Sequence, residues 1–207
     1  MKRLTNTLVL IAIAVTSTGV AQAQFVPGGV ALRPEFGFGI DSSFGVVFGG
    51  AMTYAFSENM AVGPVFAFST AGRKFELTSD VDSATGKAIV FGGRFYYMFN
   101  PEHDYPWYID AGIGIVKYGS INETDEGQKF AINNEEAEIE GATRFGFNFG
   151  GGTMYGINDN MTLVIDANSY IGGHGEPVVK AGNNEIKLQD VGSFWLLTFT
   201  VGLNFAL

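Results

Sequence analysis

Hydrophobic and polar residues alternate along most of this chain with a period of two, the pattern of a β-strand whose two faces meet different surroundings. The last segment, 191–207, shows this most clearly. Large apolar residues such as Phe199 and Phe205 share one parity, and small or polar residues such as Thr198 share the other. We expect the apolar face to meet lipid and the small, polar face to line the interior of a closed sheet.

Strands of this kind are expected near residues 30–41, 43–56, 60–70, 87–99, 107–118, 142–156, 161–171 and 191–207. Each supplies the roughly 9–11 residues that a tilted transmembrane strand requires. Short connections rich in turn-forming residues lie at 57–59, 100–106 and 157–160. Long, polar connections lie at 71–86, 119–141 and 172–190. Short turns are expected to face the periplasm and long loops to face outward. The connection at Asp41 and Ser42 is an exception, an outer loop that has shrunk to a hairpin turn.

This arrangement predicts an all-β fold, a closed antiparallel transmembrane β-barrel of about eight strands in an up-and-down meander. Composition agrees, because 46% of the 207 residues are hydrophobic and only 16% are charged, with 29 Gly and 19 Phe. Beyond the N-terminal segment, no apolar stretch approaches the roughly 18 residues of a transmembrane helix. A sheet in lipid must close, because an open edge leaves backbone groups without hydrogen bonds.

Charge and cysteine content exclude several kinds of function. The net charge of −9 argues against a nucleic-acid partner. The absence of Cys excludes disulfides, thiolate metal sites and cysteine nucleophiles. We expect no cofactor and no dedicated metal site.

The N-terminus has the three parts of a secretion signal. Lys2 and Arg3 are basic, Leu8–Val15 is apolar, and Ala21 and Ala23 form a small-x-small cleavage site. The alternative, a retained membrane anchor, is disfavoured because the apolar core is too short to span a bilayer. The sequence therefore predicts a cleavable signal peptide over 1–23 and a barrel domain over 24–207, exported to the outer membrane.

Charged residues within the predicted strands share the inward parity, which predicts a polar network in the lumen. They are Arg33, Glu35, Arg94, Asp110, Arg144 and Asp166. Arg94 and Asp110 lie on consecutive strands at similar distances from the turn between them, so we expect an ion pair across the ladder. Three arginines and three acids sum to zero. Because a narrow barrel holds side chains and little else, the sequence favours a plugged, neutral lumen over an ion path.

Four residues fit this pattern less simply. Lys87 and Lys117 share the outward parity, but both lie at the outer rim, where a long side chain can carry its ammonium into water. Pro34 and Pro64 fall inside strands although proline cannot donate to a ladder. We expect a bulge or a later strand start near each proline.

Aromatic residues cluster around the second short turn, at Tyr97, Phe99, Tyr105, Trp107 and Tyr108. Trp and Tyr favour the boundary between membrane and water. We therefore predict that this cluster is part of a periplasmic aromatic girdle rather than a set of ordinary strand residues.

Two stretches resemble the small bacterial outer-membrane β-barrel superfamily, which includes OmpA-like transmembrane domains, OmpX-type and OmpW-type proteins. Residues 54–63, Tyr-Ala-Phe-Ser-Glu-Asn-Met-Ala-Val-Gly, look like its strand–turn–strand. Residues 106–114, Pro-Trp-Tyr-Ile-Asp-Ala-Gly-Ile-Gly, look like its fifth strand. The resemblance covers nearly all of the chain after the predicted signal peptide.

The C-terminal residues resemble the assembly signal of that superfamily, which the barrel-assembly machinery recognises. The matching positions are Thr200, Gly202, Phe205 and Leu207. Many bacterial members end in Phe, whereas this chain ends in Leu207 with Phe205 two residues before it.

The first functional hypothesis is a scaffold that presents polar loops for envelope integrity, adhesion or another surface interaction. Its partners would be outer-membrane lipids and lipopolysaccharide, the assembly machinery, and an extracellular ligand bound by the loops. The longest loop is acidic, with Glu123, Asp125, Glu126, Glu135, Glu136, Glu138 and Glu140 against Lys129. We interpret it as a solvated, flexible charge run. A cation-mediated contact with lipopolysaccharide is a weaker interpretation, because the spacing of a calcium loop is missing.

Transport is the second hypothesis, a narrow channel for small or hydrophobic molecules as the OmpW-type resemblance implies. Gly146, Gly150 and Gly152 on the inner face, beside outward Gly151, would leave room for it unless they serve close packing.

Lipid A modification is the third hypothesis, with His174, Ser169 and Asp166 as candidates and His103 in the opposite turn. It is remote, because Asp166 and His174 are more than about 20 Å apart along a strand that rises about 3.3 Å per residue. No nucleophile and base are placed together, so we expect no enzymatic activity and no catalytic residue.

Overall fold

The structure is a computed structural model that describes residues 25–41, 43–71, 74–75, 84–85, 87–120, 129, 131–132, 135–141, 143–172, 178–187 and 194–207. The predicted signal peptide and its cleavage residues Ala21 and Ala23 lie outside these residues and stay a prediction. No helix in the described part of the chain is long and apolar enough to cross a membrane.

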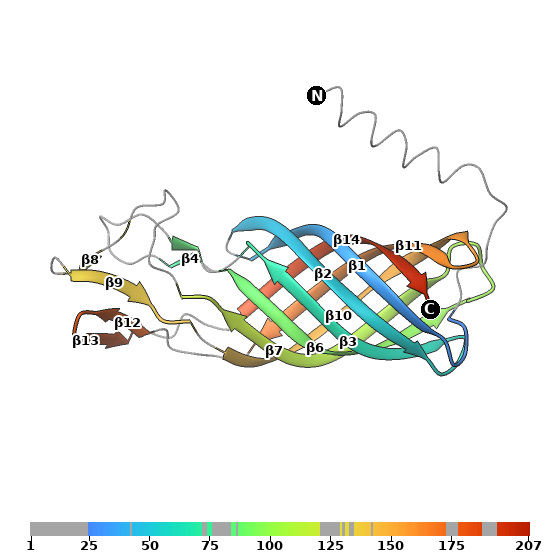
Figure 1. Ribbon diagram of the computed structural model, residues 1–207, viewed down its shortest axis with the longest axis horizontal. Coiled ribbons are helices and arrows are strands. Elements are labelled where there is room, and N and C mark those ends of the chain that lie inside the picture. The colour runs from blue at the N-terminus through green and yellow to red at the C-terminus, as the bar shows by residue number, and fades with distance from the viewer. Residues whose placement is uncertain are drawn as a thin grey trace, which may run out of the picture.

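Eight strands close into a barrel (Figure 1). They are β1 (Val30–Ile40), β2 (Phe44–Ala55), β3 (Met60–Ser69), β6 (Ala88–Phe99), β7 (Trp107–Tyr118), β10 (Thr143–Asn158), β11 (Met161–Gly172) and β14 (Phe194–Ala206). Their order around the barrel is β1-β14-β11-β10-β7-β6-β3-β2, a meander that closes where the last strand, β14, pairs with β1. The predicted fold class is confirmed, and predicted strand ends differ from observed ones by at most three residues.

The two faces of the wall follow the alternation in the sequence. On β14, Phe199, Val201 and Phe205 are exposed, whereas Thr198 and Thr200 are buried. Large exposed apolar side chains cover the outside of every barrel strand, and small or polar side chains fill the inside. In a membrane the outer surface meets hydrocarbon. A closed wall can do so because it has no open edge with unpaired backbone N–H and C=O groups.

Both strand prolines lie inside regular strands, so the expectation of a bulge or a later start is wrong. The β1–β14 pairing passes from Leu32↔Phe205 to Glu35↔Gly202, an advance of three residues on each strand with no register shift. Pro34 falls in that gap. The β2–β3 pairing has a similar gap at Pro64, again without a shift. Each proline is unpaired on the side of one neighbouring strand and stays paired with the strand on its other side. Pro34 is paired with Gly50 of β2, and Pro64 with Gly93 of β6.

Two small sheets lie beyond the end of the barrel from which the long loops leave (Figure 1). The larger, which we name the outer sheet, has the order β13-β12-β9-β8, with β8 (Ala131–Ile132), β9 (Glu135–Ile139), β12 (Val178–Ala181) and β13 (Asn184–Lys187). The smaller pairs β4 (Lys74–Phe75) with β5 (Ala84–Thr85).

The outer sheet corrects the interpretation of the acidic loop as a flexible charge run. Within β9, Ala137 and Ile139 are buried and alternate with exposed Glu136 and Glu138. Apolar residues at every second position give this part of the loop a strand pattern despite its charge. Glu123, Asp125 and Glu126 lie outside the described residues.

β14 is the strand that closes the barrel, and backbone hydrogen bonds hold its C-terminal end to residues next to both neighbouring strands. Ala206 donates its N–H to the carbonyl of Asn160, and Leu207 donates to the carbonyl of Val30 at 2.9 Å. We predict that Phe205→Asp together with Leu207→Asp abolishes insertion, because it places two carboxylates on the lipid face of this strand and alters the predicted assembly signal. The measurement is the amount of folded, heat-modifiable protein in outer membranes.

The matched control is Asn204→Asp, which adds a carboxylate to the inward parity of the same strand end. It should insert at close to the normal level. Normal outer-membrane levels of the Phe205/Leu207 double variant would refute the assembly role of these residues.

Candidate functional site

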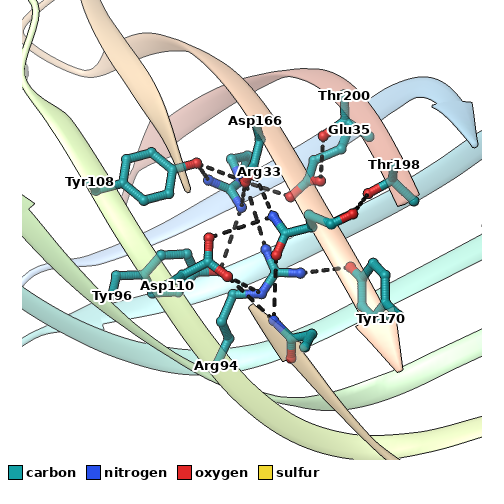
Figure 2. A network of polar contacts seen from close by, with 12 residues as sticks. Arg33, Glu35, Arg94, Tyr96, Tyr108, Asp110, Asp166, Tyr170, Thr198 and Thr200 are labelled. Atoms are coloured by element: carbon teal, nitrogen blue, oxygen red, sulfur yellow. Dashed lines mark hydrogen bonds and ion pairs between the residues drawn. The ribbon is translucent and has the colours of Figure 1, made fainter. Parts of the chain in front are cut away.

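Polar side chains from six of the eight barrel strands meet in the middle of the lumen (Figure 2). This lumen network consists of Arg33 and Glu35 (β1), Arg94 and Tyr96 (β6), Tyr108 and Asp110 (β7), Asn148 (β10), Asp166, Asn168 and Tyr170 (β11), and Thr198 and Thr200 (β14). β2 and β3 place small residues beside the two arginines, because Ala51 is paired with Arg33 and Gly63 with Arg94.

Arg33 connects one half of the network. Its Nε lies 2.8 Å from Glu35 Oε1, and its Nη2 lies 3.2 Å from Asp166 Oδ2. It also donates to the hydroxyls of Tyr108 at 3.2 Å and Tyr96 at 3.4 Å. Tyr108 in turn donates to Asp166 at 2.7 Å. Strands β1, β6, β7 and β11 are thus joined across the lumen by one guanidinium.

Arg94 connects the other half. Its Nε lies 3.2 Å from Asp110 Oδ1, Nη1 lies 3.6 Å from Asp166 Oδ2, and Nη2 donates to the Tyr170 hydroxyl at 2.6 Å. The guanidinium also lies over the rings of Tyr96 and Tyr170 at 5.8 and 5.7 Å from their centroids. Arg94 and Asp110 are buried, so each is the main neutralising partner of the other.

The predicted Arg94–Asp110 ion pair forms, but not between residues that stand directly opposite each other, as we expected. It forms along a diagonal of the ladder. In the register of β6 and β7, Arg94 stands opposite Gly112 and Asp110 opposite Tyr96. The turn between β6 and β7 sets a register in which the two charged residues are offset by two residues, which is one position on the inward face. The long side chain of Arg94 spans this offset.

Two amides complete the contacts of the aspartates. Asn148 donates to Asp110 Oδ1 at 3.3 Å, and Asn168 donates to Asp110 Oδ2 at 3.5 Å and to Asp166 Oδ1. Buried carboxylates are expensive unless each oxygen accepts hydrogen bonds or faces a cation. Both aspartates meet this condition in the closed barrel.

Arg144 has the inward parity but does not join the lumen network. Its Nη1 donates to the carbonyl of Thr143 at 3.1 Å, and no ion pair to it occurs within the described residues. The network therefore sets two arginines against three carboxylates, not the neutral six residues expected. Glu35, the third carboxylate, accepts a hydrogen bond from Thr200 at 3.1 Å.

Apolar layers lie on both sides of the lumen network. The turn-side apolar layer, near the short turns, consists of Phe25, Ala55, Ala61, Tyr96, Met98, Tyr108, Met154 and Val164. The outer apolar layer consists of Val47, Ala67, Ala71, Ala88, Val90, Val116, Tyr170 and Leu196. Phe25, which precedes β1, packs edge-on against Tyr96 at 6.4 Å. A molecule passing through would have to displace all three layers.

The inner glycines of β10 do not leave the room that a channel would need. A Cβ on Gly150 or Gly152 would lie 2.3 or 2.2 Å from a backbone oxygen of β11, and one on Gly146 would lie 2.8 Å from another. Close packing is the role that this geometry supports. Beside Asn148 and Tyr170 the lumen has a cavity of about 10 Å³, enough for about one water.

Four of the five aromatic residues predicted as a girdle have the expected position at the short-turn end, namely Tyr97, Phe99, Tyr105 and Trp107. Phe99 and Trp107 stack at 4.2 Å between centroids, and Trp107 is 51% exposed. Tyr108 does not belong to this group, because it is only 1% exposed and points into the lumen. Adjacent strand residues face opposite sides, so Trp107 and Tyr108 cannot both face lipid.

Tyrosines and amides of the network were missed from the sequence, namely Tyr96, Tyr170, Asn148 and Asn168. Their inward parity was the available signal, since each lies two or four residues from a predicted network residue or inner glycine. A charged residue on the lipid face costs much free energy, so its inward direction can be predicted from its type. A neutral polar residue costs less there, so its type alone does not predict which way it points.

The catalytic candidates do not come together in the described residues. The Ser169 hydroxyl accepts a hydrogen bond from Trp195 Nε1 at 2.6 Å, and Asp166 is held by Arg33 and Tyr108. His103 lies in the short turn, where its Nδ1 accepts the N–H of Tyr105. His174 lies outside the described residues. Nor does any group of three His, Asp or Glu in the described part of the chain have the placement to hold a metal ion.

Comparison with known proteins gives one family and a set of similar folds. The profile of the outer membrane protein β-barrel domain matches residues 8–205. A major outer membrane protein of Thermus thermophilus has 14% identity and a TM-score of 0.61, with 86% of this chain and 99% of that chain covered. Neisserial surface protein A has 12% identity and a TM-score of 0.53, with 86% and 95% covered. No protein with a curated description matches by sequence.

Removing one partner of the buried Arg94–Asp110 pair should destabilise the barrel strongly. We predict that Arg94→Ala or Asp110→Ala lowers the free energy of unfolding by about 3–5 kcal/mol, because each leaves a buried charge without its partner. The measurement is the urea unfolding midpoint of the refolded protein. Arg144→Ala, an inward arginine outside the network, is the control and should cost clearly less. An unchanged midpoint in both Arg94→Ala and Asp110→Ala would show that the pair does not brace the barrel.

A second pair of variants separates the lumen from the girdle. Tyr108→Phe should lower the free energy of unfolding by about 1–3 kcal/mol, because the hydroxyl that links Arg33 to Asp166 is lost. Tyr97→Phe, on the outward parity near the same turn, should cost about 0.5 kcal/mol or less. The reverse ranking in urea unfolding would mean that Tyr108 faces the membrane boundary.

Proposed function

Because the chain belongs to the outer membrane protein β-barrel domain family, we propose that it is a rigid scaffold with a plugged lumen, which presents the outer sheet for surface contact or envelope integrity. The protein is a bacterial outer-membrane β-barrel. The observation that carries the proposal is the three-layered filling of the lumen. Two apolar layers enclose a network in which each charge already has a partner inside the barrel.

The bracing of the wall by contacts across the lumen supports the scaffold role. The lumen network ties six strands together with contacts between residues as far apart in sequence as Arg33 and Asp166. Breaking one contact leaves the remaining members buried with unsatisfied charge, so the network resists stepwise opening. A barrel braced in this way holds its outer end in a constant position relative to the membrane.

The outer sheet is the part of the described chain that is available for contact outside the cell. The exposed charged residues on and beside it are Glu135, Glu136, Glu138, Glu140 and Glu185 against Lys129 and Lys180. Lys180 Nζ lies 3.2 Å from Glu140 Oε1 and 3.7 Å from Glu185 Oε1, so it joins β12 to β13 and to the end of β9. The hydrogen bond with Glu140 raises the pKa of Lys180, which keeps this bridge charged. We infer a rigid acidic surface rather than a mobile loop.

Transport and catalysis have less support. A narrow channel would need a continuous path, but the glycines expected to provide it are packed against neighbouring backbone. Modification of lipid A would need a nucleophile and a base within reach of each other, and the described residues hold no such pair. The scaffold is therefore the proposed function, without enzymatic activity.

Planar-bilayer recording tests the plugged lumen. The purified, heat-modifiable protein should show no stable single-channel conductance, because apolar side chains close both sides of the lumen network. Arg94→Ala, recorded in parallel, should also be silent, since the two apolar layers remain. Discrete openings of the wild type whose amplitude changes in Arg94→Ala would contradict the plugged scaffold and establish the lumen as a path.

A further inference from the structure

The lipid-facing wall of the barrel is almost free of charge, and Lys117 is the exception. Within the eight barrel strands, the other ionised side chains are Arg33, Glu35, Arg94, Asp110, Arg144 and Asp166, all on the inward parity. Lys117 lies near the outer end of β7, is exposed, and follows the outward residues Ile113 and Ile115 in the same row.

A second lysine and a hydroxyl lie beside Lys117 on the neighbouring strands. Lys117 stands opposite Ile89 of β6. Beyond the end of the strand pairing, Gly119 donates its N–H to the carbonyl of Lys87, so these two residues stand opposite each other. Lys87 is therefore the diagonal neighbour of Lys117 on the outward face, about 7–8 Å away. On the other side, Thr143 of β10 stands directly opposite Lys117. All three residues are exposed.

The height of these residues matches the boundary between hydrocarbon and headgroups. The next outward residues toward the membrane centre are Ile89, Ile115 and Phe145, all exposed and apolar. At about 3.3 Å per strand residue, the lysines begin within about 7 Å of this apolar belt. A lysine at such a position extends its ammonium toward the headgroups while its methylene chain stays in contact with apolar surface.

These lysines also differ from Lys129 and Lys180 in having no acidic partner among the residues that the structure describes. Lys129 is paired with Glu136, and Lys180 with Glu140 and Glu185. No ion pair to Lys87 or Lys117 occurs within the described residues. In a chain with a net charge of −9, these two adjacent cations, which form no ion pair with the described part of the chain, lie on the outward face.

We propose that Lys87 and Lys117, with the hydroxyl of Thr143, bind the phosphate of an anionic lipid in the outer leaflet. Lysine ammonium groups are point-charge donors to phosphate, and basic clusters at the membrane surface recognise anionic headgroups. The acidic outer sheet disfavours phosphate groups approaching from outside, so the anion reaches these lysines from the membrane side. This site rests on the orientation used in the proposed function, with the long loops outside, but not on whether the lumen conducts.

The test measures lipid binding to the protein purified from outer membranes in a neutral sugar detergent. Bisphosphorylated lipid A is titrated in the same micelles and bound lipid is counted by native mass spectrometry. Lys87→Ala and Lys117→Ala should each weaken binding about fivefold, and the double variant about 30-fold. The double variant should remain heat-modifiable, because both side chains are exposed. Replacing both lysines with arginine should restore binding.

Controls separate this site from general charge effects. The double variant Lys129→Ala with Lys180→Ala removes the same charge from the outer sheet and should bind lipid A as the wild type does. Lipid A without its phosphates should bind the wild type as weakly as the phosphorylated lipid binds the Lys87/Lys117 double variant.

Three results would overturn the proposal. Equal binding by the wild type and the Lys87/Lys117 double variant would remove these residues from the site. Equal binding of the lipid with and without phosphates would leave only acyl-chain contact. Displacement of the lipid by inorganic phosphate at equal concentration would identify a site for free phosphate instead of a lipid headgroup. Because none of these results depends on conductance, failure here is distinct from failure of the plugged scaffold.

Discussion

A chain in lipid must satisfy every backbone hydrogen bond within itself, and the rest of this structure depends on that constraint. Closure of the sheet meets it, and closure at eight strands makes the interior so narrow that its side chains touch across it. Any charge placed inside must then find its partner among a few neighbours. Arg33 and Arg94 do so by reaching from opposite parts of the wall toward a shared carboxylate, Asp166.

The strands and their two faces could be predicted from the sequence because a period of two is a local property. A large apolar residue such as Phe199 has a strong preference for lipid, and its neighbours then point inward without further information. The same rule, applied strictly, also places Tyr108 inside. The error there came from reading aromatic residues by their type and position in the chain instead of by their parity.

What could not be predicted depends on geometry between strands. The offset of one inward position between Arg94 and Asp110 is set by how the turn is centred, which no residue in either strand encodes. Arg144 has the correct parity but lies too near the outer end to reach the network. The outer sheet forms from two loops that are distant in sequence, and only the alternation of Ala137 and Ile139 with glutamates signalled that one of them is a strand.

Pro34 has a consequence for the mechanics of the barrel. The β1–β14 junction joins the two ends of the chain, and its ladder lacks pairing at the two positions around this proline. The β2–β3 ladder has a similar gap at Pro64, but the β1–β14 seam is the one that joins the first strand of the barrel to the last. The lumen network compensates from inside: Arg33, next to the proline, anchors that edge to Asp166 on β11, the strand beyond β14. At this seam the wall is thus held by its backbone ladder and also by a side chain that reaches past the neighbouring strand.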